Sequence, residues 1–136
     1  MTYNEVAKAI EELVQRRIQL KIKLSQTSNQ NTFIDSILAK NQALLVLANN
    51  NIKQLVSADL VNIEDFLRMK ASCEPVMAVI DANLFKKRQN VSQIIVAKKE
   101  IKELDFERKR LEGMLNETSR IHNLFQKKDR KGREND

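Results

Sequence analysis

The chain has 136 residues, and its composition is 42% hydrophobic, 31% charged and 4% aromatic, with a formal net charge of +6. Two glycines and one proline are too few for a β-rich fold with many tight turns. Aliphatic residues without tryptophan, together with abundant Lys and Glu, are typical of long helices and coiled coils. The single cysteine, Cys73, excludes an intramolecular disulfide and a paired-cysteine metal site. We therefore predict an all-α protein of about one domain.

The amino-terminal residues indicate in which cell compartment to expect the protein. Acids at Glu5, Glu11 and Glu12 interrupt the apolar run that a signal peptide needs, and no segment approaches about 18 consecutive apolar residues. The sequence thus predicts no membrane span. We expect the protein in a reducing cytoplasm, which is the host cytoplasm if the protein is viral.

A heptad pattern opens the chain. Apolar side chains recur at alternating steps of three and four residues through the first 24 positions, which predicts a helix about 35 Å long with one narrow apolar seam. Arg17 interrupts the seam, where it can extend to water, meet an acid on a partner or fix the register of packing. The seam positions are Tyr3, Val6, Ile10, Leu13, Arg17, Leu20 and Leu24.

The segment 25–32, SQTSNQNT, is predicted to be a loop, because Ser, Thr and Asn side chains compete with helical backbone hydrogen bonds. A second helix is expected from about Phe33 to Val56. Its centre, ALLVLA at 43–48, is apolar on all sides, which predicts the most buried part of the fold. Asn41 and the asparagines at 49–51 flank this centre. They indicate either a helix that ends, frays or kinks near residue 50, or a polar layer that sets oligomer register.

A second break is predicted at 57–62. Asn62 followed by Asp65 resembles a capping box that opens a short helix ending near Ala71. Ser72 is then expected to cap the last helix, whose first turn accommodates Pro75 because a missing N–H costs little there.

The last helix is predicted to be the longest. Its pattern continues from Glu74 to Gly113, and the sequence leaves open whether the helix passes through this glycine. The final residues lack apolar side chains. Residues 1–125 are thus predicted to form a single helical domain, and residues 126–136 a mobile basic tail.

Residues that catalysis or metal binding requires are scarce. His122 is the only histidine, and no glycine-flanked turn presents a serine nucleophile, although Ser119 stands three residues before it. One His and one Cys predict no metal site, and isolated glycines predict no phosphate-binding loop. We therefore expect a protein without enzymatic activity, catalytic residues or cofactors.

Residues 84–110 combine an apolar helical face with two basic rows, each with an 11-residue repeat. These rows have two interpretations: they follow the phosphates of a nucleic acid, or they are the solvated flank of a coiled coil, with acids near enough to pair. The row beside the apolar face is Lys87, Lys98 and Lys109, and the outer row is Arg88, Lys99 and Arg110.

We expect an antiparallel hairpin of the first two helices, a short connecting helix and a long carboxy-terminal helix, arranged as a coiled-coil-like bundle. Part of the apolar seam of the longest helix would extend beyond its neighbours, and a second copy would cover it best. The sequence therefore predicts a homo-oligomer, with a dimer favoured. The predicted interface residues are Val6, Ile10, Leu13, Leu20, Ile94, Ile101, Leu104, Leu111 and Leu115.

These features favour a small helical assembly or adaptor protein that contacts another protein through its helices. Scaffold and inhibitor proteins of viruses and phages fit this description. The alternative is a sequence-nonspecific nucleic-acid-binding protein that uses the two basic rows.

Overall fold

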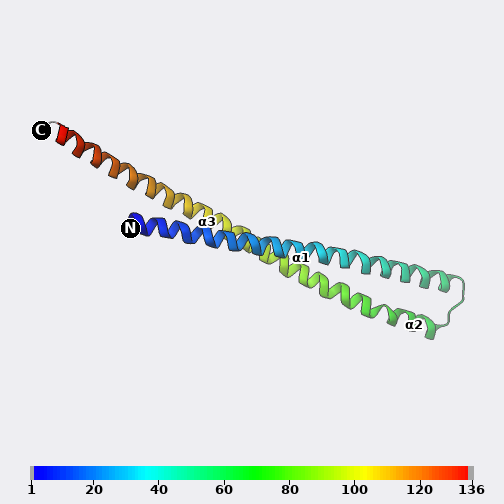
Figure 1. The fold of residues 1–136 in the computed structure, drawn as a ribbon. Helices are drawn as coiled ribbons and strands as arrows, with labels where there is room; N and C mark the ends of the chain where they lie inside the picture. The colour runs from blue at the N-terminus through cyan, green and yellow to red at the C-terminus, as the bar shows by residue number, and fades with distance from the viewer. Residues whose placement is uncertain (1, 135–136) are drawn as a thin grey trace. The chain divides into compact units, whose positions relative to one another are not determined.

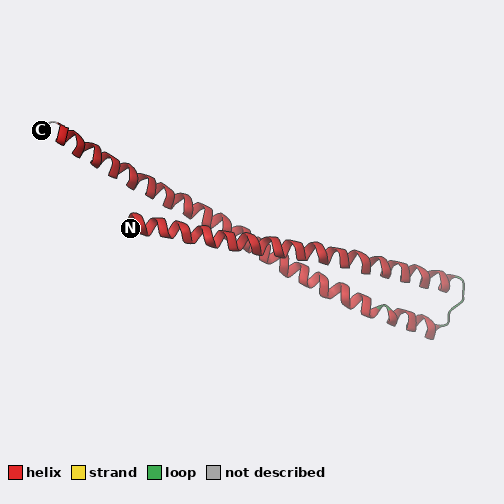
Figure 2. Cartoon of the chain, viewed as in Figure 1, coloured by secondary structure: helices red, strands yellow, loops and turns green. Residues whose placement is uncertain are grey.

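The computed structural model describes the backbone of residues 2–134 and the side chains of residues 2–124. Three helices follow one another along the chain, α1 (Tyr3–Ser57), α2 (Ile63–Ser72) and α3 (Glu74–Glu134) (Figure 1). No strand occurs between residues 2 and 134, and the one extended connection joins α1 to α2 (Figure 2). The predicted all-α class is thereby confirmed.

The chain divides into two compact units, and α1 and α3 contribute to both. The first unit joins the residues up to Leu24 with those from Val96 onward, and the second unit is Ser25–Ile95. Within each unit, a segment of α1 packs against a segment of α3 that runs in the opposite direction (Figure 1). The predicted single domain over 1–125 stays a prediction.

A heptad runs through the whole of α1, well beyond the first 24 residues. Its inward positions, at alternating steps of four and three residues, are all buried or half-buried, which is the pattern of a coiled-coil seam. These positions are Val6, Ile10, Leu13, Arg17, Leu20, Leu24, Thr27, Asn31, Ile34, Leu38, Asn41, Leu45, Ala48, Ile52 and Leu55.

The predicted loop at 25–32 is wrong, and with it the hairpin between the first two predicted helices, because α1 is continuous across this segment. Thr27 and Asn31 occupy inward heptad positions there. The Thr32 hydroxyl donates to the Ser28 carbonyl oxygen at 3.2 Å, so this polar side chain is satisfied inside the helix. The low helix propensity of such residues costs only tenths of a kcal/mol each, about 0.7 at most, and tertiary packing overrides it.

The predicted break after residue 57 is confirmed, and a Schellman motif forms it. Asp59 has a φ of 58°, a left-handed conformation that aspartate tolerates better than most residues. The N–H of Leu60 donates to the Leu55 carbonyl oxygen at 3.0 Å, and the N–H of Asp59 donates to the Val56 carbonyl oxygen at 3.1 Å. These two bonds satisfy carbonyls that the end of α1 would otherwise leave without partners.

The predicted cap of α2 is also confirmed, because the N–H of Asp65 donates to the Asn62 side-chain oxygen at 2.8 Å. Ser72 does not cap α3 as predicted. Its hydroxyl instead donates to the Met69 carbonyl oxygen at 2.6 Å. The last residue of α2, Ser72, and the first of α3, Glu74, are separated only by Cys73, which leaves no room for a free capping residue.

The helix α3 passes through Gly113 without a break. A glycine inside an exposed helix costs about 1 kcal/mol relative to alanine, which is not enough to end a helix that packing supports on its amino-terminal side. The predicted mobile tail comprises residues 126–136, whose side chains lie outside the described residues. Its mobility stays a prediction.

Each unit has a small core of its own. Val6, Leu20, Ala97, Ile101 and Leu111 are buried in the first unit. In the second unit, Ile34, Leu38 and Ile80 form a buried cluster against which Leu45, Val76 and Leu84 pack. Two helices bury only one side of each other, so most of the remaining helix surface faces solvent.

Candidate protein-interaction surfaces

The nine predicted interface residues are already covered to a large extent within one chain. Val6, Leu20, Ile101 and Leu111 are buried. The other five, Ile10, Leu13, Ile94, Leu104 and Leu115, are half-buried. Because burial within one chain uses this surface, the residues that remain exposed are better candidates for contact with another chain. The assignment of the nine to an interface between chains stays a prediction.

The segment ALLVLA at 43–48 is not the most buried part of the fold, and this prediction is wrong. Leu44, Val46 and Leu47 are 50%, 59% and 58% exposed. Only Leu45 and Ala48, at heptad positions, turn inward and are half-buried. The physical reason is that α3 covers one side of α1, whereas a helix that is apolar on all sides needs neighbours all round.

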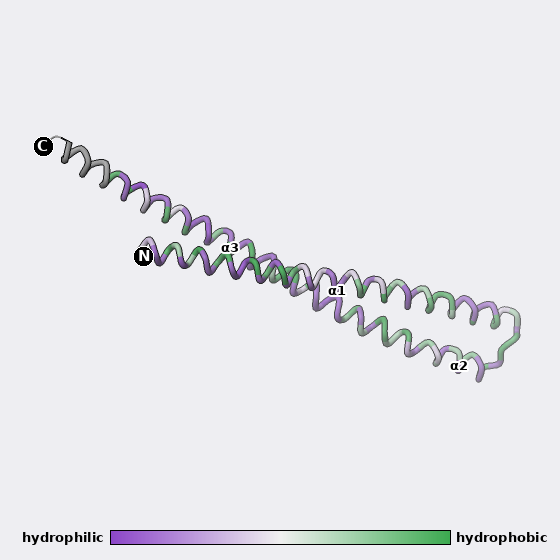
Figure 3. Tube along the Cα trace, viewed as in Figure 1, coloured by the Kyte–Doolittle hydropathy of each residue, from purple (hydrophilic) through white to green (hydrophobic). Residues whose placement is uncertain are grey.

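Exposed large apolar side chains occur at similar frequency in the two units. Among the residues whose side chains are described, they number 13 of 71 in the second unit and 8 of 52 in the first. Figure 3 shows hydrophobic runs along the second-unit part of α1 and the start of α3, and a mainly hydrophilic α3 in the first unit. The 13 are Phe33, Leu44, Val46, Leu47, Val56, Leu60, Ile63, Leu67, Met77, Val79, Phe85, Val91 and Ile95.

The end of the second unit carries a groove between α1 and α2. Its lining includes Ile52 and Val56 from α1, and Phe66 and Lys70 from α2. The Lys70 Nζ atom lies 5.3 Å from the centre of the Phe66 ring, within range of a cation–π interaction. No residue of α2 is buried, although the helix is amphipathic, so its apolar side remains largely open.

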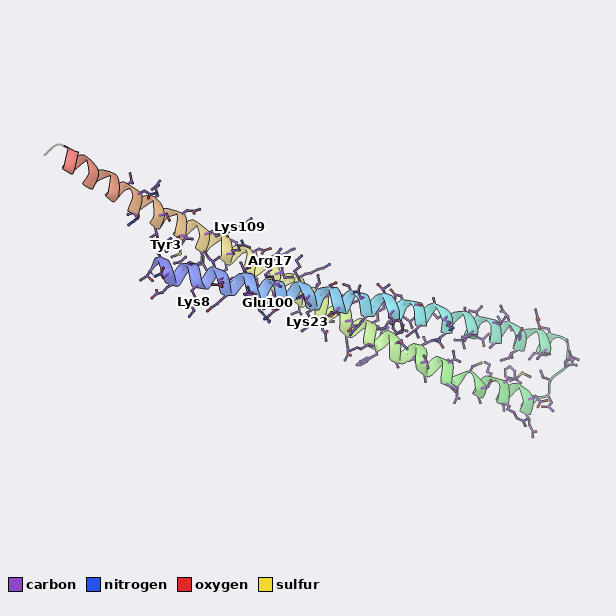
Figure 4. The ribbon with its side chains drawn as sticks, in the orientation of Figure 1. Tyr3, Lys8, Arg17, Lys23, Glu100 and Lys109 are labelled. Carbon is purple, nitrogen blue, oxygen red and sulfur yellow. The ribbon has the colours of Figure 1, made fainter. Side chains whose placement is uncertain are left out.

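The two helices of the first unit are joined by ion pairs. Figure 4 labels one member of each pair, Arg17 on α1 and Glu100 on α3. Arg16 Nε lies 3.1 Å from Glu100 Oε1, and Arg17 Nε lies 2.7 Å from Asp105 Oδ1. Arg17, which interrupts the seam in the sequence, therefore meets an acid of the same chain. Such half-exposed pairs contribute little free energy, about 0.2–1 kcal/mol each, but they favour one alignment of the helices.

An asparagine pair lies inside the second unit, and the sequence alone did not reveal it. Asn90 Nδ2 donates to Asn31 Oδ1 at 2.9 Å. Asn90 is only 1% exposed, and its own Oδ1 has no hydrogen-bond partner among the described residues. A buried amide oxygen of this kind costs about 1–3 kcal/mol. The sequence does contain a signal for this pair, because the heptad pattern, continued past Leu24, places Asn31 at an inward position.

A layer of two asparagines is a known means of fixing helix alignment, because any other register leaves both amides buried without partners. Asn41, which the sequence suggested for such a layer, donates instead to its own helix, at the Ile37 carbonyl oxygen. Asn31 and Asn90 are thus placed to favour one alignment of α1 and α3 within this unit, and the role of the asparagines near residue 50 in oligomer register stays a prediction.

The six predicted polyanion-binding residues lie on α3, and two of them have acidic partners. Lys87 pairs with Asp35 of α1, and Arg110 pairs with Glu107 one helical turn away. The hydrogen bond from Arg110 lowers the pKa of Glu107, and the same bond raises the pKa of Arg110. The other four form no ion pair with a described residue: Arg88, Lys98, Lys99 and Lys109.

Polar side chains of the types that enzymes use in catalysis lie together at one place in the first unit. Tyr3 from α1 and Ser119 and His122 from α3 line a shallow groove, with Thr118 and Asn123 beside them. Ser119 and His122, which stand three residues apart in the sequence, thus lie on the same surface. Among the described residues, no three His, Cys, Asp or Glu side chains are placed to hold a metal ion.

Comparison with protein-family models, with curated proteins and with solved structures finds no match for this chain. None of the helices, over the residues described, has an apolar stretch sufficient to cross a membrane.

Proposed function

We propose that this protein is a non-enzymatic assembly or adaptor protein that acts through helix–helix contacts, and that it forms a homo-oligomer, with a dimer favoured. The observation that carries the proposal is the exposure of Leu44, Val46 and Leu47 in a segment that is apolar on all sides. Exposed apolar clusters of this kind mark contact sites for other proteins.

The proposal also covers the biological role of the protein and its cell compartment. A scaffold or inhibitor role, including one encoded by a virus or phage, is compatible with small size and helix–helix contacts. A reducing cytoplasm suits a chain whose one thiol, Cys73, is buried and free.

Sedimentation equilibrium of the full chain over a range of micromolar concentrations tests the proposal. We expect a mass near twice the 15.8 kDa of one chain, with dissociation only on dilution. A mass of one chain at every concentration would contradict self-assembly.

A second candidate function is sequence-nonspecific nucleic-acid binding. The observation that favours it is that Lys98, Lys99 and Lys109 are exposed and form no ion pair with a described residue. Cations without acidic partners can bind phosphates and release the counterions that phosphates hold.

Binding to a fluorescent oligonucleotide at increasing salt separates the two candidates. Nucleic-acid binding predicts an affinity that falls steeply between about 50 and 200 mM salt, and a loss of binding when Lys98→Glu and Lys99→Glu are combined. Lys8→Glu with Lys21→Glu is the control, because it makes the same change in net charge on α1. Absence of binding at the lowest salt would end this candidate.

A further inference from the structure

The second unit presents a second apolar stripe on α1, separate from its seam. We call it the α1 stripe and define it as Phe33, Ile37, Leu44 and Leu47. At 100° per residue these four lie within about 80° of one another, and their centre is about 110° from the centre of the seam. Phe33, Leu44 and Leu47 are 68%, 50% and 58% exposed, and Ile37 is half-buried.

The surroundings of the α1 stripe carry very little charge. No residue between 41 and 52 is charged, and Lys40 is the one charged residue between positions 36 and 52. A helix surface that faces water in a single chain normally carries charged side chains on that side. The composition of this stretch therefore resembles a covered helix face, although Phe33, Leu44 and Leu47 remain at least half exposed in the single chain.

The α1 stripe is suited to a second copy of itself. The second unit has seven basic and six acidic residues, a net charge of +1, so two copies repel each other little when these faces meet. A two-fold symmetric contact uses the same patch on both chains, and an apolar stripe is complementary to an identical stripe.

We propose that a second copy of this chain docks on the α1 stripe, with the stripe of one copy packed against the stripe of the other. Leu44 and Leu47 are then the central contacts, and Phe33 lies toward one end. Lys40 lies within the same arc, between Ile37 and Leu44. It packs its methylene groups along the interface and extends its ammonium group outward to water. This inference rests on the proposed homo-oligomer and assigns the surface that forms it.

The main test is the variant that combines Leu44→Lys with Leu47→Lys. Both side chains are half or more exposed in the single chain, so the substitutions leave the fold within one chain intact, which helical circular dichroism checks. We expect the dimer dissociation constant to rise at least about 100-fold, because four leucines lose their buried contacts per dimer. The control combines Ile18→Lys with Ile22→Lys, at 48% and 54% exposure on the same helix, and it should dissociate like the unmodified chain.

A second variant keeps the inference testable if the first loses helicity. Lys40→Met removes the one charge within the arc of the α1 stripe and keeps a side chain of similar length. We expect the dimer to tighten by at least about threefold, because the charged group no longer resists burial. An unchanged dissociation constant in Lys40→Met would then overturn the assignment.

The outcomes distinguish the two proposals. If the unmodified chain is a monomer, the proposed homo-oligomer fails and the α1 stripe fails with it. If the unmodified chain is a dimer and the Leu44 and Leu47 double variant stays equally dimeric, the assembly stands and the stripe is the wrong surface. Equal dissociation of the Ile18 and Ile22 control would also reject the stripe as the specific contact.

Discussion

The two units are built from the same pair of helices with the same heptad spacing, but their surfaces differ. In the first unit, 29 of 65 residues are Asp, Glu, Lys or Arg, whereas in the second unit 13 of 71 are. The first unit has one ion pair beside its seam, Arg16–Glu100, and one from a seam position, Arg17–Asp105. The second places an asparagine pair in its interior and leaves leucines at its surface.

The same heptad pattern therefore behaves differently in water with charged flanks than with apolar flanks. A narrow seam with charged flanks is complete in water, because the charged side chains solvate what the partner helix does not cover. A seam with apolar flanks is incomplete, because apolar side chains such as Leu44 and Leu47 remain half or more exposed in the chain. We therefore expect the first unit to be sensitive to salt and charge, and the second to be sensitive to protein concentration.

The largest effect is expected from a change in the buried cluster of the second unit. Leu38→Ala removes a side chain that packs with Ile34 and Ile80. We expect the free energy of unfolding to fall by about 2–5 kcal/mol, from lost burial and the cavity that remains. Urea denaturation at one fixed protein concentration measures it. Ile22→Ala, at an exposed position of the first unit, should change stability by no more than about 0.5 kcal/mol. Equal effects of the two changes would show that the buried cluster is not a core.

A smaller effect, of opposite sign, is expected at the asparagine pair. Replacing Asn31 and Asn90 together with leucine removes a buried oxygen without a partner, and the free energy of unfolding should rise by about 1–3 kcal/mol. The more stable protein should also lose its single alignment, which would appear as extra amide resonances by NMR. Asn90→Leu alone should be less stable than the double variant, because it leaves Asn31 without its partner. A double variant that unfolds more easily would contradict the register role.

The smallest effect is expected for the ion pair between Arg17 and Asp105. A double-mutant cycle to alanine should give a coupling free energy of about 0.5 kcal/mol, because both side chains are about 40% exposed and solvent screens them. The coupling should decrease further when salt is raised from about 0.05 to 0.5 M. A coupling that salt does not change would mean that packing, rather than charge, joins these residues.

Much of the fold was predictable because it depends on periodic patterns. The all-α class, the break after Ser57 and the cap at Asn62 follow from apolar spacing and from side chains with specific backbone roles. The continuous helix through 25–32 was not predicted, because polar residues there were assigned to a loop by their local preferences. Their inward positions depend on α3, which brings Asn90 to Asn31 from 59 residues away.

The candidate surface was harder to predict for the same reason. The apolar segment 43–48 shows that α1 needs several neighbours, but the sequence does not show how many the chain itself supplies. The structure supplies one, α3, and leaves Leu44 and Leu47 exposed. The nine seam residues, chosen because their spacing was regular, are the ones that a partner helix within the chain already covers.

A dimer formed through the α1 stripe is tested most directly by an isotope-filtered NMR experiment on an equal mixture of labelled and unlabelled chains. Such an experiment detects only contacts between different copies. We expect intermolecular contacts from the methyl groups of Leu44 and Leu47 in such a dimer. Intermolecular contacts from the methyl groups of Val6 and Leu111 alone would contradict this expectation, because those seam residues would then pack between chains and the exposed leucines would not.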